Sequence, residues 1–143
     1  MKKLLSVLAI VFMIFCVPVA SFAAPVSLPA NVQLSSNGII TVTNPPSFTS
    51  TTQKGVVFCG YGAPGTKVTI YEYNGQAGAY TKVSNSSVTV SSSGVFWKKV
   101  DFSSGYHKVI VYAENGNSSQ AVKREINVLS PTIKSYTLNI KRF

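Results

Sequence analysis

Few residues in this chain have side chains that could act as a nucleophile, an acid, a base or a metal ligand. His107 is the single histidine, and Cys59 is the only cysteine outside the apolar N-terminal segment. The acidic residues are scattered along the chain, at Glu72, Asp101, Glu114 and Glu125. Catalysis or metal binding needs several such groups close together. We therefore expect a protein that is not an enzyme and holds no metal or other cofactor, with His107 exposed at a strand start.

A second group of residues suits binding rather than catalysis. Alternation along the strands expected below places Tyr71, Tyr73, Trp97 and Tyr112 on outward positions, with Lys99 nearby. Flat aromatic rings on a sheet can stack on sugar rings, and a lysine can meet uronic acids or wall phosphates. The same aromatic residues also stabilise sheets as cross-strand pairs. A purely structural role therefore stays open beside a ligand-binding face.

The chain is strongly basic. It has 13 Lys and Arg residues against 4 Asp and Glu residues, which gives a formal net charge of +9. Such a charge favours anionic partners, for example cell-wall phosphates, an acidic extracellular polymer or polysaccharide, or lipid headgroups. Nucleic acid is not expected as the main partner, because the N-terminus, described next, predicts export from the cell.

The N-terminus has the pattern of a cleaved signal peptide. Two lysines precede an apolar run over residues 4–19, and cleavage after Ala23 leaves small residues before the cut. We predict a signal peptide at residues 1–23 and a mature protein that is secreted, either extracellular or attached to the cell surface. No transmembrane segment is expected to remain. Cys59 would then be the only cysteine, so no intrachain disulfide can form.

The rest of the chain has the pattern of an all-β domain. Apolar residues alternate, and Ser, Thr, Val and Tyr are frequent between turn residues. After a flexible lead-in at residues 24–38, with a short extended piece at 32–34, one domain is expected over residues 39–143. Its strands are expected at 39–43, 47–51, 55–60, 67–73, 80–83, 87–90, 95–102, 107–113, 120–128 and 136–140.

Turn residues join the strands at 55–60 and 67–73. Pro64 and Gly65 have the types that a type II turn requires at its second and third positions, and we predict a hairpin there.

Alternation also predicts which side chains fill the core. Thr69 and Ile110 are expected to face outward with the aromatic residues above. The first strand of the Pro-Gly pair is apolar on both sides, so Phe58 is favoured inward while the facing of Cys59 stays open. The other expected inward residues are Val56, Val68, Ile70, Phe96, Val100, Phe102, Val109, Val111 and Ala113.

Glycines and apolar residues recur in a fixed order along residues 41–128. The positions are Gly60, Pro64, Gly65, Val68, Ile70, Gly94, Phe96, Gly105, Val109, Val111, Ala113 and Val128. This order resembles that of bacterial immunoglobulin-like (Big-type) domains. The resemblance implies an immunoglobulin-like antiparallel β-sandwich of about seven to nine short strands. Lys98 departs from it, so either its stem is buried beneath a solvated amine or the faces slip there.

The segment after Val128 lies outside that pattern. Residues 133–141 alternate and predict an additional C-terminal strand. This strand can form an edge of the same domain or be donated to a neighbouring copy, which would give self-association.

The sequence as a whole predicts a secreted, non-enzymatic structural or adhesion module of the bacterial cell surface. The alternative is a carbohydrate-binding module that uses its outward aromatic residues.

Overall fold

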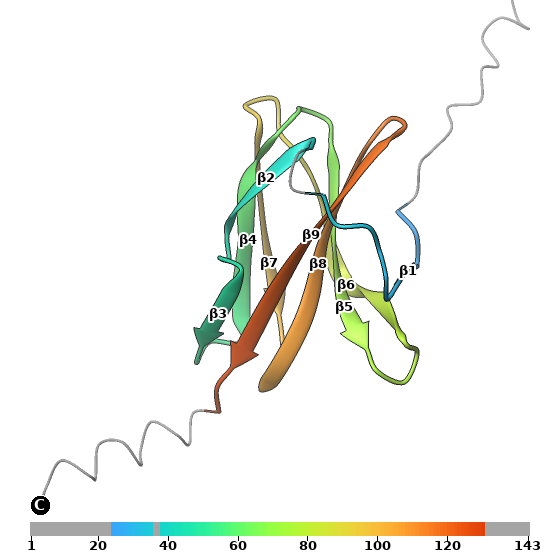
Figure 1. The fold of residues 1–143 in the computed structure, drawn as a ribbon. Helices are drawn as coiled ribbons and strands as arrows, with labels where there is room; N and C mark the ends of the chain where they lie inside the picture. Colours follow the sequence, from blue (N-terminus) through green and yellow to red (C-terminus); the bar gives the residue numbers. More distant parts are fainter. Residues whose placement is uncertain (1–23, 36–37, 131–143) are drawn as a thin grey trace, which may run out of the picture.

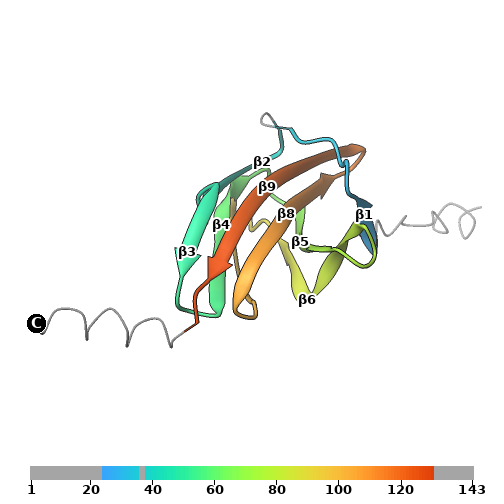
Figure 2. The same cartoon turned by 60° about the horizontal axis from the view of Figure 1, so that its bottom comes forward.

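The computed structural model of the chain describes residues 24–35 and 38–130. These residues form nine β-strands in two sheets, which pack face to face as a β-sandwich (Figures 1 and 2). The expected all-β sandwich is therefore confirmed. Within the described ranges, no helix is long and apolar enough to cross a membrane. The predicted signal peptide and the predicted strand at 133–141 lie outside the described residues.

The larger sheet has six strands in the order β1-β6-β5-β8-β9-β3, and the smaller sheet has the order β2-β4-β7. Neighbouring strands are antiparallel except β3 and β9, which pair in parallel. The strands are β1 (Ser27–Pro29), β2 (Ile40–Asn44), β3 (Phe48–Thr51), β4 (Gly55–Gly62), β5 (Lys67–Asn74), β6 (Ala79–Thr89), β7 (Val95–Asp101), β8 (Gly105–Asn115) and β9 (Ser118–Val128).

The strand order is that of an immunoglobulin-like sandwich. Strands β4 and β7 take the places of strands B and E, and β9, β8, β5 and β6 take those of G, F, C and C′. The chain switches sheets between β2 and β3, so that β3 can pair with β9, the last strand of the described residues. Membership of the Big-type family itself stays a prediction.

Strand β6 is continuous where the sequence predicted two strands, at 80–83 and 87–90. Four residues of β6, 83–86, lie opposite the single residue Ile70 of β5, where the register shifts. Asn85 takes up part of this mismatch with a φ of 51°, in the left-handed region that Asn tolerates. The residues between the two predicted strands therefore form an irregular stretch of one strand.

The turn after β4 contains the Pro-Gly pair. Gly65 has a φ of 82°, and the amide of Thr66 donates to the carbonyl of Ala63 at 3.1 Å, as in a type II turn. The prediction of a hairpin is wrong, because β4 belongs to the small sheet and β5 to the large one. The turn carries the chain across the sandwich, a difference that alternation on either side of Pro64 cannot reveal.

The main core lies between the two sheets. Every residue that the sequence placed inward is buried, including Val56 and Phe58 on β4. Cys59 is half-buried on the outer side of that strand, which settles the facing that was left open. Ile40, Val90, Ile126 and Val128 complete the core.

A second, smaller apolar cluster covers part of the outer side of the large sheet. Residues 24–35 include β1, and after β1 they cross over one end of this sheet toward β2 (Figure 2). The buried members of the cluster are Leu28, Tyr71, Tyr80, Ile110 and Ala121.

Burial on the outer side of the large sheet corrects two sequence-based expectations. Tyr71, Thr69 and Ile110 were expected to face solvent, but they are buried, at 0, 1 and 1% exposure. Alternation assigned them to the outer side correctly, and the outer side is covered. The segment that was expected to be a flexible lead-in contains β1, whereas residues 32–34 are not in a strand.

Gln120 of β9 fastens this covering segment to the sandwich. Its side chain is 3% exposed, and its Oε1 accepts a hydrogen bond from the amide of Ile40 at 2.8 Å. Its Nε2 donates to the carbonyl of Ser35 at 3.3 Å. One buried amide therefore holds the end of the covering segment and the start of β2.

Arg124 of β9 holds the place where the chain switches sheets. Its Nε donates to the carbonyl of Pro45 at 2.8 Å, and its Nη2 donates to the carbonyl of Val42 at 3.0 Å. Because a guanidinium presents its donors in a fixed planar fork, it can hold both carbonyls at once.

Candidate functional site

The only histidine of the chain is buried at one end of the sandwich, where it contacts a partly exposed carboxylate. Nδ1 of His107 lies 2.5 Å from Oε1 of Glu72, and its Nε2 lies 2.9 Å from the carbonyl oxygen of Ser103. The ring is 7% exposed and packs against Phe102, so the expectation of an exposed histidine is wrong. Both ring nitrogens have protein partners, which gives the pair a structural role between β5, β8 and the loop after β7.

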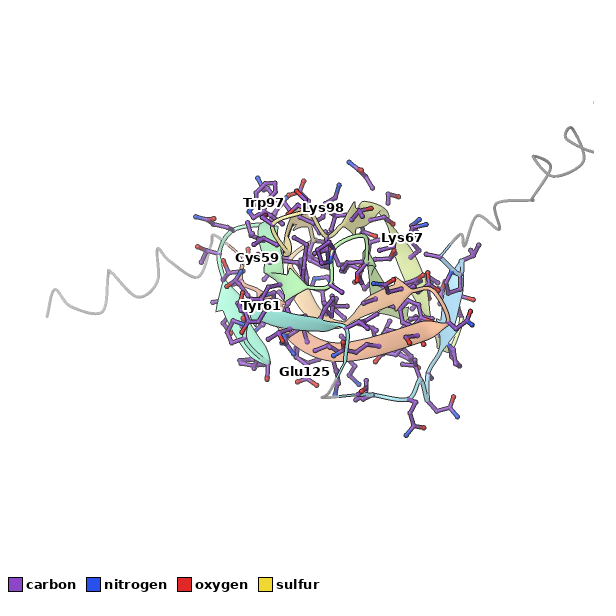
Figure 3. The ribbon with its side chains drawn as sticks, turned by 90° about the horizontal axis from the view of Figure 1, so that it is seen from above. Cys59, Tyr61, Lys67, Trp97, Lys98 and Glu125 are labelled. Carbon is purple, nitrogen blue, oxygen red and sulfur yellow. The ribbon has the colours of Figure 1, made fainter. Side chains whose placement is uncertain are left out.

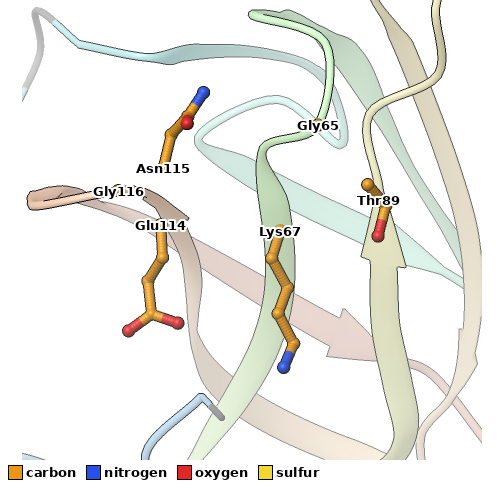
Figure 4. Close-up of a pocket in the computed structure, with 6 residues that line it drawn as sticks. All are labelled: Gly65, Lys67, Thr89, Glu114, Asn115 and Gly116. Carbon is orange, nitrogen blue, oxygen red and sulfur yellow. The ribbon is translucent and has the colours of Figure 1, made fainter. Parts of the chain in front are cut away.

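The remaining carboxylates are dispersed. Residues 24–35 and 38–130 contain no group of three or more His, Cys, Asp or Glu side chains that could hold a metal ion. Glu114 lies beside a hollow of about 280 Å³ together with Lys67, which extends from the neighbouring strand (Figure 4). Its Oε2 is buried without a hydrogen-bond partner. This hollow contains one carboxylate and one ammonium group, and its lining residues include no aromatic or large aliphatic side chain.

The five residues predicted to form a ligand face are not brought together. Trp97 and Lys99 lie on β7, on the outer side of the small sheet. Tyr71, Tyr73 and Tyr112 lie on β5 and β8, on the outer side of the large sheet. Because the sheets pack through their inner faces, the two groups point in opposite directions. Alternation separates inward from outward positions but does not say to which sheet a strand belongs.

Two of these tyrosines serve the fold. Tyr71 is fully buried, and its hydroxyl donates to the carbonyl of Pro25 at 2.6 Å. The rings of Tyr71 and Tyr112 meet edge-on, with their centroids 6.0 Å apart. Burial, followed by the nearby Glu114 carboxylate, raises the pKa of Tyr71 to about 12. Tyr71 therefore cannot contact a ligand.

Tyr73 remains at the surface, although it is engaged by neighbours. Its ring packs edge-on against Tyr80, with centroids 5.3 Å apart. The ammonium group of Lys108 lies 5.8 Å from the ring centre of Tyr73. Such a cation–aromatic contact at an exposed site contributes about 0.5–1 kcal/mol.

The outer side of the small sheet has an exposed aromatic and aliphatic surface, which we call the Trp97 face. It is formed by Tyr61, Val95 and Trp97, which are 56, 50 and 60% exposed, with Cys59 and Lys99 beside them. Figure 3 shows Trp97, Cys59 and Tyr61 along the same side of the sandwich.

Strand register places the two aromatic residues of the Trp97 face near each other. Trp97 lies directly opposite Cys59, and Val95 lies directly opposite Tyr61. Trp97 and Tyr61 are therefore diagonal neighbours, a relation in which residues lie roughly 7–8 Å apart and long side chains can meet. A single extended ligand can contact both rings.

The sequence reasoning missed Tyr61 and Val95. The predicted strand ended at Gly60, whereas β4 continues to Gly62. Extending the same alternation by two residues would have placed Tyr61 on the outer side with Cys59. Val95 begins β7 and shares the outward alternation of Trp97, so the signal for both residues was present.

Lys98 is the residue that departs from the Big-type sequence pattern, and two arrangements were expected for it. Its Nζ donates to Oδ1 of Asn85 at 3.2 Å, so the amine reaches the rim of the sandwich beside β6. The neighbouring inward residues Phe96 and Val100 stay buried. The Lys98 stem therefore starts on the inner side of β7 and carries the amine to the rim of the sandwich, and the two faces of β7 do not change places.

Positive charge exceeds negative charge over the described part of the chain. Its eight cationic side chains are Lys54, Lys67, Lys82, Lys98, Lys99, Lys108, Lys123 and Arg124, against the four acidic residues already named, a difference of four. Two of those acids are paired, Glu72 with His107 and Glu125 with Lys123.

Comparison with known proteins does not add a family to these observations. No family model and no curated protein matches the chain.

Proposed function

We propose that this protein is a non-enzymatic extracellular module with a structural or adhesive role, which attaches to anionic cell-wall or matrix polymer. The observation that carries the proposal is the Trp97 face. Three large apolar side chains stand exposed side by side on one sheet, and such a surface on a soluble domain is typical of an interaction site. The surplus of basic residues supports an anionic partner.

The chemistry of the Trp97 face suits a polymer. Trp97 and Tyr61 offer flat rings that can cover the C–H faces of sugar units, and the phenol offers a hydrogen bond. Lys99 lies beside them and can meet a phosphate or uronate group of the same chain. Because a strand fixes the backbone and aromatic side chains have only two side-chain torsions, little conformational freedom is lost on binding.

The state of the chemically capable residues supports the non-enzymatic part of the proposal. The His107 ring is buried, and its two nitrogens contact the Glu72 carboxylate and the carbonyl oxygen of Ser103. Cys59 has Thr43 as its polar neighbour, with Sγ and Oγ1 3.7 Å apart, rather than a histidine base.

A carbohydrate-binding module for neutral polysaccharide is the second candidate. It is favoured by the diagonal placement of Trp97 and Tyr61, which can stack on sugar rings without any contribution from charge. Salt separates the two candidates, because ionic attraction at an exposed surface weakens as ionic strength rises and stacking does not.

The test is co-sedimentation with insoluble cell walls that carry anionic polymer and with the same walls after the anionic polymer is removed. We expect Trp97→Ala or Tyr61→Ala to weaken binding about tenfold, the loss of one central aromatic contact. Leu34→Ala is the control, because Leu34 is 52% exposed and lies away from this face. Wild-type binding should fall at high salt and on removal of the anionic polymer.

Unchanged binding by both aromatic variants would reject the Trp97 face as the attachment surface. Equal binding to both wall preparations, with no effect of salt, would replace the anionic partner with a neutral polysaccharide.

A further inference from the structure

The outer side of the large sheet has a part that residues 24–35 leave uncovered. A hollow of about 370 Å³ lies there, lined by Ser47, Phe48, Lys123 and Glu125, and we call it the Phe48 hollow. Its volume falls at the lower end of the range of small-molecule sites, roughly 300–1,000 Å³. The Phe48 hollow lies on the opposite sheet from the Trp97 face, and Figure 3 shows Glu125 on a different side from Trp97.

Residues of β3 and β9, with Ser47 just before β3, line this hollow, and β8 lies next to β9 on its other side. Phe48 of β3 lies directly opposite Glu125 of β9, which lies directly opposite Lys108 of β8. Tyr106 is two residues before Lys108 on the same outward side of β8. Phe48 is thus the direct neighbour of the central carboxylate on one side, and Tyr106 is its diagonal neighbour on the other. The two side chains are 56 and 51% exposed.

The polar groups of the hollow are held in place by one another. Oε1 of Glu125 lies 2.7 Å from Nζ of Lys123. The hydrogen bond to Lys123, and after it the hydrogen bond from the Tyr106 hydroxyl, lowers the pKa of Glu125. The same contact with Glu125 raises the pKa of Tyr106. At neutral pH the site therefore presents an ionised carboxylate that is in contact with an ammonium group and a phenol.

These groups retain unused hydrogen-bonding capacity. A carboxylate has about four acceptor sites and an ammonium group has three donors, and their mutual contact uses only part of each. A sugar hydroxyl both donates and accepts, so adjacent hydroxyls match an adjacent acceptor and donor. The C–H face of the same sugar matches the aromatic rings of Phe48 and Tyr106.

Charge decides between kinds of ligand. Among the lining residues, Glu125 repels an anionic group and Lys123 repels a cation. The ammonium group of the adjacent Lys108 lies over the Tyr73 ring. The paired charges at the centre therefore favour a ligand that is neutral and rich in hydroxyls. We propose that the Phe48 hollow binds a neutral sugar unit of an extracellular glycan. This site is independent of the Trp97 face, because different residues on the opposite sheet form it.

The test begins with an array of neutral glycans probed with the folded protein, followed by calorimetric titration of the strongest ligand. We expect Phe48→Ala and Glu125→Gln each to weaken binding about tenfold, as the loss of a central contact does. Trp97→Ala is the matched aromatic control on the opposite sheet and should leave the affinity within about twofold. Binding should be nearly independent of salt, unlike attachment to anionic polymer.

Glu125→Gln preserves side-chain size, so it tests the site even if Phe48→Ala disturbs β3, and thermal unfolding reports whether either variant is folded. The proposal is overturned if no neutral glycan binds, or if folded Glu125→Gln binds as the wild type does. It is also overturned if Trp97→Ala, rather than the hollow variants, abolishes binding, because the sugar would then occupy the other face.

Discussion

Tyr71 shows how one buried side chain links the fold to pH. Its hydroxyl donates to the Pro25 carbonyl, its ring packs against Tyr112, and it has no exposed surface. Removing its proton would place a negative charge in this apolar cluster and break the hydrogen bond. Its pKa of about 12, against the ordinary 10.0, expresses that cost.

Tyr71 should make the protein less stable at high pH. Below pH 10 the phenol is protonated in both the folded and the unfolded chain, so its contribution to stability is complete. Between pH 10 and about 12 the unfolded chain loses the proton first, and the free energy of unfolding falls. The slope for one group is at most about 1.4 kcal/mol per pH unit.

The measurement is chemical unfolding of wild type and Tyr71→Phe across this pH range. At neutral pH the variant should be about 1 kcal/mol less stable, because the Pro25 carbonyl loses its donor. At alkaline pH the difference should shrink and then reverse, since phenylalanine has no proton to lose. A constant difference at every pH would contradict the assignment.

Strand β1 and the residues that follow it form a short segment that decides how much of the large sheet's outer side is exposed. They bury one part of the large sheet's outer side, with Leu28 in contact with Tyr71 and Tyr80 in one cluster. They leave the Phe48 hollow open on the same side. A short segment thus determines which outward residues belong to the fold and which are free to bind.

Removal of the Leu28 side chain should uncover this cluster. We expect Leu28→Ala to lower the free energy of unfolding by about 2–3 kcal/mol, the usual loss for a buried leucine with a cavity left behind. Val26→Ala is the control, since Val26 is 85% exposed, and it should change stability by less than about 0.5 kcal/mol. Equal effects of the two variants in urea unfolding would show that β1 does not cover the sheet.

At the scale of strands, the sequence could predict features that depend on local pattern, but not those that depend on contacts between residues far apart in the chain. Val68 and Ile70 were predicted as core residues because the main core needs only alternation along one strand. Tyr71 and Ile110 were placed on the correct side but wrongly expected to be exposed, because their cover comes from residues more than forty positions earlier, near Leu28. The two predicted halves of β6 are one strand because pairing with β5 overrides the polar composition of residues 84–86.

On the scale of the whole molecule, the two candidate surfaces lie on opposite sheets of one sandwich. All-β architecture followed from the spacing of alternating runs and turns, but the pairing of strands into sheets did not. The predicted ligand face joined Trp97 to Tyr73 because both point outward, although they lie on different sheets. Phe48 and Glu125 meet only through the parallel pairing of β3 with β9, which no short-range pattern reveals.

If both proposed surfaces bind, one molecule can bridge two polymers. We expect the protein to agglutinate particles coated with anionic polymer together with particles coated with the neutral glycan. Trp97→Ala and Phe48→Ala should each abolish mixed agglutination while keeping binding to the other particle, which light scattering and sedimentation can measure. Mixed agglutination that survives either variant would show that the two surfaces are not the bridging sites.

The parallel pairing of β3 and β9 also has a mechanical consequence. Phe48 at the start of β3 lies beside Glu125, and Thr51 at its end lies beside Val128. A pull on the chain before β3 and after β9 drags the two strands in opposite directions along their length. All hydrogen bonds of the ladder then resist together in shear, instead of opening one at a time. For the adhesive role proposed above, this orientation of β3 and β9 would resist tension carried along the chain between them.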